Sequence, residues 1–141
     1  VATASTRRQL YAAVFSSVSG TFAADEEINQ ASTGAVGKVV EYDATNKLLY
    51  WYQTRFPDVG TDANGNATAF SGANAITGQT SSASATPNTS SSTDVNGVSI
   101  TSGYSNPELA ADSGDIIYVE ERSPITRASD QTENIKLIIE F

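Results

Sequence analysis

The sequence contains no cysteine and no histidine. The absence of cysteine excludes disulfides, thiolate nucleophiles and cysteine metal sites, and the absence of histidine removes the commonest general base and a common transition-metal ligand. Any hydrolytic chemistry would therefore depend on carboxylates. Methionine is also absent and the chain begins with Val1, so we expect it to be processed or to be part of a longer translation product.

Basic residues are few: 8 Lys and Arg stand against 16 Asp and Glu, which gives a net charge of -8. Such a surface repels phosphate backbones and anionic lipid. No apolar stretch approaches the roughly 18 residues that a membrane-spanning helix needs, and the first residues lack the apolar core of a secretory signal. We therefore expect neither nucleic acid nor a membrane as a partner.

Apolar residues make up 39 % of the chain, a little below the roughly 45–50 % of typical globular domains. Ser, Thr, Ala, Asn and Gly take their place, and this composition is typical of strands and turns. The 141 residues fit one domain, or one domain with an appended segment.

The clearest local pattern is a β-hairpin over residues 38–53. Strands are predicted over 38–42 and 47–53, and the turn residues 43–46 lie between them. Alternation places Leu49 and Trp51 on one face and Leu48, Tyr50 and Tyr52 on the other, so we expect both faces to be covered. Residues 7–18 fit either a helix or a strand, and we favour the strand.

An internal similarity recurs at a spacing of 48 residues, between 22–35 and 70–83. Three positions fall in register: Phe22 with Phe70, Ile28 with Ile76, and Ala35 with Ala83. The pattern indicates two similar β units, at about 20–40 and 68–88, that pack into a small sandwich or barrel. The alternative is a coincidence of common strand-and-turn composition. The Ser/Thr-rich residues 79–93, which begin within the second unit and continue past it, are predicted to form a long loop.

The last third predicts a short helical turn over 106–112, opened by Asn106 with Pro107 at its first position. Strands are predicted over 115–121 and 134–141. The final strand runs to Phe141, and so apolar an end is expected to be tied into a sheet or a subunit interface.

Candidate chemistry is sparse. The acids at 25–27 and 120–121 could in principle form an acid-base pair, but solvated or interface charge is the favoured interpretation. Residues 62–66 have oxygen ligands at alternate positions, yet the downstream Glu of a calcium loop is missing, which favours an Asn-Gly turn. The aromatic run 50–52 could be a glycan or partner platform, and a hairpin core is favoured over it.

The carboxyl-terminal pattern is more specific. It comprises Pro-Glu-Leu at 107–109, Ser-Gly-Asp at 113–115, Ile-Tyr at 117–118, a Glu, Arg, Pro, Ile series at 120–125, and Asp-Gln-Thr-Glu with an apolar strand at 130–141. In this order it resembles the carboxyl-terminal part of the baseplate wedge subunit, the product of gene eight, of T-even-type contractile-tailed bacteriophages. Residues 1–105 follow that family less closely, and we interpret them as an inserted or lineage-specific module.

The resemblance implies a non-enzymatic structural protein of the virion's tail baseplate, without a cofactor and without catalytic or metal-binding residues. It implies assembly in the host cytoplasm, contacts with other wedge proteins, and a homodimer or higher assembly. Candidate partner-contact residues are Tyr118, Arg122, Arg127, Asp130 and Phe141.

We therefore predict a mainly β protein with two parts. Residues 1–105 form a β module with the internal repeat, and residues 106–141 form a wedge-subunit-like β segment with a short helical turn. The competing function is a virion-associated module that binds a receptor or glycan, or decorates the particle.

Overall fold

The computed structural model describes residues 8–53 and 59–108. They form nine strands: β1 (Tyr11–Ser19), β2 (Glu27–Gln30), β3 (Ala35–Asp43), β4 (Leu48–Tyr52), β5 (Ile76–Gly78), β6 (Ser84–Pro87), β7 (Asp94–Val95), β8 (Val98–Ser99) and β9 (Tyr104–Ser105). No helix occurs in this part of the chain, and hence none that could cross a membrane. The prediction of a mainly β protein is confirmed, and so are the strand within residues 7–18 and the hairpin formed by β3 and β4.

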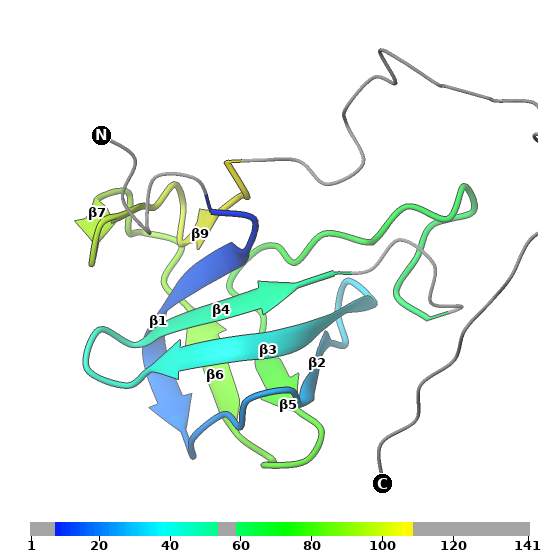
Figure 1. The fold of residues 1–141 in the computed structure, drawn as a ribbon, viewed down its shortest axis with the longest axis horizontal. Coiled ribbons are helices and arrows are strands. Elements are labelled where there is room, and N and C mark those ends of the chain that lie inside the picture. The colour runs from blue at the N-terminus through cyan, green and yellow to red at the C-terminus, as the bar shows by residue number, and fades with distance from the viewer. Residues whose placement is uncertain (1–7, 54–58, 109–141) are drawn as a thin grey trace, which may run out of the picture.

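Six strands close into a barrel (Figure 1). The order is β4-β3-β2-β5-β6-β1, every neighbouring pair is antiparallel, and β1 also pairs with β4. Register shifts between Phe15 and Ser17 in β1, and between Val39 and Glu41 in β3, bend these strands in the way that closure of so small a sheet requires. Of the two architectures that the sequence left open, the barrel is the one formed.

The barrel interior is filled by one apolar cluster. Its buried members are Ala13, Phe15, Phe22, Ile28, Ala35, Val39, Leu49, Trp51, Phe70, Ile76, Ala83 and Ala85. Trp51 packs edge-on against Phe70, with ring centroids 5.1 Å apart. Its ring also lies against Gly37, where a Cβ would be only 2.7 Å from the indole Cδ1. A side chain at position 37 would therefore displace the largest core residue.

A second apolar cluster lies on the outer side of β1 and β4. Ala12, Val14 and Leu48 alternate with the interior residues of their strands, and they are covered by Val98 and Ile100. These two side chains come from the segment 88–105, called the arm below, which contains the β7–β8 hairpin and β9. The inner face of β4 is thus covered, as predicted, and its outer face is covered at Leu48 and in part at Tyr50.

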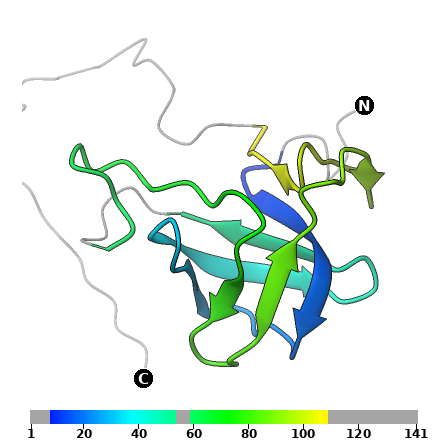
Figure 2. The ribbon, with the colours of Figure 1, turned by 180° about the vertical axis from the view of Figure 1, so that it is seen from behind.

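The 48-residue similarity corresponds to matching strand pairs. Ile28 pairs with Gly37 in the first hairpin, and their counterparts Ile76 and Ala85 pair in the second. All six residues that carry the similarity are buried in the barrel core. Across the β2–β5 contact, Asn29 pairs with its own counterpart, Thr77. This pairing of equivalent residues relates the two units by an approximate two-fold rotation. Figure 2 shows the second strand pair, β5 and β6 in green, from behind.

The prediction of a loop over residues 79–93 is wrong for its middle part. Strand β6 occupies Ser84–Pro87, pairs with β1 and β5, and buries Ala85. Small side chains are what the interior side of a narrow barrel accommodates, so low-complexity composition did not prevent burial here. The predicted helical turn over 106–112 lies, from residue 109 on, outside the described residues, as do the strands predicted over 115–121 and 134–141.

Candidate partner-binding face

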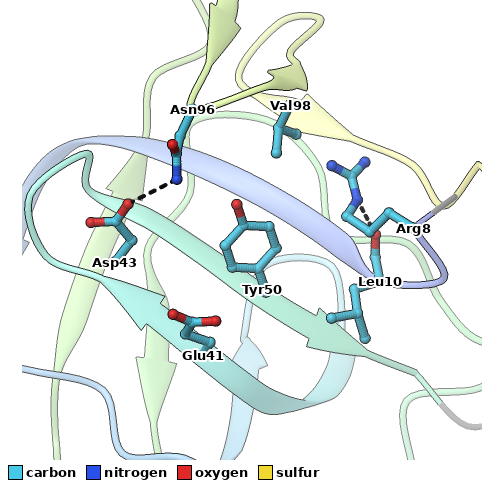
Figure 3. Close-up of a pocket in the computed structure, with 7 residues that line it drawn as sticks. All are labelled: Arg8, Leu10, Glu41, Asp43, Tyr50, Asn96 and Val98. Atoms are coloured by element: carbon cyan, nitrogen blue, oxygen red, sulfur yellow. Dashed lines mark hydrogen bonds between the residues drawn. The ribbon is translucent and has the colours of Figure 1, made fainter. Parts of the chain in front are cut away.

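An open hollow of about 320 Å³ lies between the outer side of the β3–β4 hairpin, the arm and the segment that precedes β1. Figure 3 shows the side chains that surround it: Arg8, Leu10, Glu41, Asp43, Tyr50, Asn96 and Val98. Three distant parts of the sequence therefore meet here. Because Glu41 and Tyr50 are paired across β3 and β4, the hairpin itself sets their relative position.

Arg8 forms one wall and is only 7 % exposed. Its Nε donates to the carbonyl of Leu10 at 2.7 Å, and its Nη2 donates to Ser105 Oγ and to the carbonyl of Asn106. The amide of Glu108 donates to the Arg8 carbonyl at 2.7 Å. Burial lowers the pKa of Arg8, while the nearby Glu108 acts in the opposite direction. Arg8 thus joins the start of the described chain to its end.

The opposite wall is acidic. Asp43 Oδ1 accepts the amides of Thr45 and Asn46, and Oδ2 accepts the side chain of Asn46 and, at 3.4 Å, that of Asn96 in the arm. The hydrogen bonds from Asn46 lower the pKa of Asp43. Burial raises the pKa of Tyr50; Arg8 opposes this rise and the neighbouring Glu41 and Asp43 add to it. The hydroxyl of Tyr50 therefore stays protonated near neutral pH and is available as a donor.

Exposed apolar surface adjoins the hairpin. Among the described residues, the large hydrophobic side chains that are exposed are Val40, at 40 %, and Val59, at 63 %. Val40 sits at the register shift of β3, next to Glu41. Val59 precedes Gly60. The backbone of Gly60 lies so close to Val36 of β3 that a Cβ on Gly60 would be 2.7 Å from the Cβ of Val36.

In the acidic run 25–27, Asp25 and Glu27 are exposed, as expected of solvated charge, and Glu26 is not. Glu26 is only 4 % exposed, so the interpretation as solvated or interface charge is wrong for this residue. Its carboxylate accepts the amides of Ala23, Thr80 and Ser81 and the hydroxyl of Ser81, at 2.7 to 3.1 Å. Burial acts to raise the pKa of Glu26, but these hydrogen bonds outweigh it, and the pKa lies below its ordinary value. Glu26 is a structural residue, and its hydrogen-bond partners in the described part of the chain carry no charge.

Gln30 occupies the equivalent place in the other half of the barrel. Its Oε1 accepts the amide of Ser71 at 2.8 Å and the hydroxyl of Thr33 at 3.0 Å. Ser71 and Thr33 are the two-fold counterparts of Ala23 and Ser81, which serve Glu26. The repeat thus builds the same polar cradle, a group of hydrogen-bond donors around one side chain, twice. Glu26, just before β2, fills one cradle, and Gln30, the last residue of β2, fills the other.

The other candidate sites have structural explanations. Asp62 Oδ1 accepts the amides of Asn64 and Asn66 and closes a turn, with Gly65 at a φ of 76°, as favoured over a calcium loop. In the described part of the chain, no group of three or more Asp, Glu, His or Cys side chains could hold a metal ion. Trp51 is 1 % exposed and belongs to the core, as favoured over a glycan platform. Its Nε1 has no hydrogen-bond partner among the described residues.

The predicted contact residues Tyr118, Arg122, Arg127, Asp130 and Phe141 all lie outside the described residues. Sequence reasoning missed the hollow. The pairing of Glu41 with Tyr50 could have been found, because both belong to the predicted hairpin. The contribution of Arg8 could not, since it depends on contacts about 100 residues apart in sequence.

Comparison with known proteins identifies the family. The family model described as "Bacteriophage T4, Gp8" matches residues 50–141, which is more than half of the chain. No curated protein and no solved structure was found to match. The matched range includes the second β unit, so the interpretation of residues 1–105 as lying outside the family pattern is wrong from residue 50 onward. The chain therefore belongs to the bacteriophage T4 Gp8 family, whose members are structural baseplate wedge proteins of the virion tail.

Proposed function

We propose that this chain holds wedge subunits of the baseplate together by protein–protein contacts and catalyses no reaction. The family match over residues 50–141 carries the proposal. The absence of histidine and cysteine from the whole sequence supports it, since most nucleophile–base pairs need one of them. The described acids also support it, because Glu26 and Asp43 are engaged in backbone hydrogen bonds.

The proposed organisation has two parts. Residues 1–105 supply a rigid β module, and residues 106–141 supply contacts through Tyr118, Arg122, Arg127, Asp130 and Phe141. The clamp between Arg8 and Glu108 supports this division, because it fixes the point at which the second part leaves the barrel. We further propose assembly in the host cytoplasm, as a homodimer or higher assembly with other wedge proteins.

The competing glycan-binding function lost its main support. A sugar platform requires an exposed aromatic face, and Trp51, the centre of the aromatic run, is enclosed in the barrel. We therefore retain one function.

The test is mass spectrometry of purified virions and isolated baseplates. Peptide 128–136, which follows Arg127 and ends at Lys136, is expected in both at a fixed ratio to other wedge proteins. Arg122→Ala with Arg127→Ala is expected to lower the ratio of the chain to other wedge proteins, whereas Lys47→Ala, at an exposed turn residue, is not. In the variants this ratio is followed with peptide 9–38, because the substitutions leave its cleavage sites after Arg8 and Lys38 intact. Absence of the chain from the virion would refute the proposal.

A further inference from the structure

We propose that the hollow beside the β3–β4 hairpin receives a basic side chain, Arg or Lys, from a neighbouring baseplate protein. The inference rests on the proposed function and adds to it the surface that makes the contact and the chemistry of the group bound. It concerns the β3–β4 hairpin, the arm and the segment before β1, and it is independent of the contacts proposed for residues 106–141.

The charges around the hollow favour a cation. The carboxylates of Glu41 and Asp43 line the hollow beside a single guanidinium, that of Arg8. The Nε and Nη2 atoms of Arg8 already donate to Leu10, Ser105 and Asn106. Asp43 is engaged by the turn and by Asn96. By contrast, the exposed carboxylate of Glu41 has no hydrogen bond or ion pair with any described residue. A basic side chain of a partner protein would give the Glu41 carboxylate an ion pair.

The remaining surface fits the stem of a long basic side chain. The ring of Tyr50 stands between Glu41 and Asn96, with its hydroxyl directed toward the arm (Figure 3), and an aromatic face attracts Arg and Lys. Leu10 and Val98 offer apolar walls, against which methylene groups pack while the charge remains at the acidic side. Exposed Val40, adjacent to Glu41, extends the contact beyond the hollow, as expected of an interface with an apolar centre and a polar rim.

Matched charge-neutralising variants test the role of Glu41. Glu41→Gln is expected to lower incorporation of the chain into baseplates severalfold, and Glu41→Lys by roughly tenfold or more, because like charges placed opposite each other at an interface are strongly unfavourable. Glu27→Gln, at another exposed glutamate on β2, is expected to leave incorporation unchanged. Equal melting temperatures of the purified variants would show that folding is retained. Equal incorporation of Glu41→Lys and the unmodified chain would overturn the inference.

Cross-linking identifies the occupant. A photo-cross-linking amino acid replaces Val40 in the full chain, and a control chain carries it at Gln79, in the β5–β6 loop at the other end of the barrel from the arm (Figures 1 and 2). In baseplates, a product from position 40, but not 79, that contains an Arg or Lys of another baseplate protein supports the inference. A product with a second copy of this chain overturns it. The absence of any cross-linked product from position 40, in baseplates that contain the chain, also overturns the inference. That outcome leaves the proposed function intact. Absence of the chain from baseplates refutes both.

Discussion

Glu26 is a carboxylate enclosed in the wall of a small barrel, with four hydrogen-bond donors directed at it. Hydrogen bonds to a charged group contribute more than neutral ones, and buried donors that lose their acceptor cost roughly 1–3 kcal/mol each. Three of these donors are backbone amides, from Ala23, Thr80 and Ser81, and they hold the two β units in fixed relation. At the residue scale, then, one carboxylate held by uncharged donors of the described residues organises a contact between distant turns.

The pH dependence of stability should identify this carboxylate. The pKa of Glu26 in the folded chain lies below its ordinary value of 4.5. Its contribution is therefore complete above the unfolded-state pKa and is lost as the pH falls through the lower folded-state pKa. Glu26→Gln, which places an amide NH₂ among donors, is expected to lower the free energy of unfolding by roughly 1–3 kcal/mol at neutral pH. The difference from the unmodified chain should shrink in acid.

Urea unfolding followed between neutral pH and about pH 3 would measure this difference, since the midpoint and slope give the free energy at each pH. Glu27→Gln serves as the control, because it removes a carboxylate from an exposed neighbour. A constant gap between the native chain and Glu26→Gln at all pH values would contradict the assignment.

At the element scale, the two hairpins use one cradle design with different occupants. Gly78 is the two-fold counterpart of Gln30, and a Cβ there would lie 2.6 Å from the Glu26 carboxylate. Glu26 already fills this cradle, so position 78 has room for glycine and not for a larger residue. In the other cradle, Gln30 Nε2 instead donates to the backbone carbonyl of Asn74, the counterpart of Glu26, at 2.9 Å.

A double-mutant cycle tests whether the cradles are equivalent. Gly78→Gln alone is expected to destabilise the chain, because the new side chain collides with Glu26. Combined with Glu26→Ala, the glutamine can enter the cradle as Gln30 does, so the double variant should be more stable than the sum of the single effects by at least about 1 kcal/mol. Additive losses in urea unfolding would argue against equivalence.

The arm is a separate element whose attachment depends on Val98 and Ile100. Val98→Asp would bury a charge without a partner and is expected to cost about 3 kcal/mol or more, or to detach the arm. Hydrogen exchange of the amides in residues 94–105 should then accelerate. Ser99→Asp, at the exposed position between them, should leave both stability and exchange close to those of the unmodified chain; similar effects of the two variants would contradict this role of the arm.

At the scale of the whole molecule, closure removes the edges that a six-stranded sheet would otherwise expose to other chains. The described chain also enters and leaves the barrel at one place, where the amide of Glu108 donates to the carbonyl of Arg8. A unit with adjacent ends and its own core has the anatomy of an independent domain.

A fragment comprising residues 8–108 is therefore expected to fold alone. Calorimetry should show a single cooperative transition whose calorimetric and van't Hoff enthalpies agree. The same fragment with Arg8→Ala provides the comparison, and it should melt at a lower temperature because Ser105 and Asn106 lose their shared donor. A fragment without a cooperative transition would mean that the barrel needs further residues of the chain.

The sequence by itself determined the class of fold, the β3–β4 hairpin and the repeat. These depend on alternation, turn residues and spacing, which are local or periodic properties that a single chain displays directly. It also carried the carboxyl-terminal pattern of the family, because that pattern is a matter of residue order.

Tertiary structure decided what depends on distant contacts. Barrel closure follows from the pairing of β1 with β4. The burial of Glu26 depends on hydrogen-bond donors more than 50 residues away. The hollow forms because Arg8 meets the hairpin and the arm. Strand β6 was missed because its small side chains carry little hydrophobic signal, although the narrow barrel interior requires small residues there. Composition reports how apolar a segment is, whereas packing decides whether it is buried.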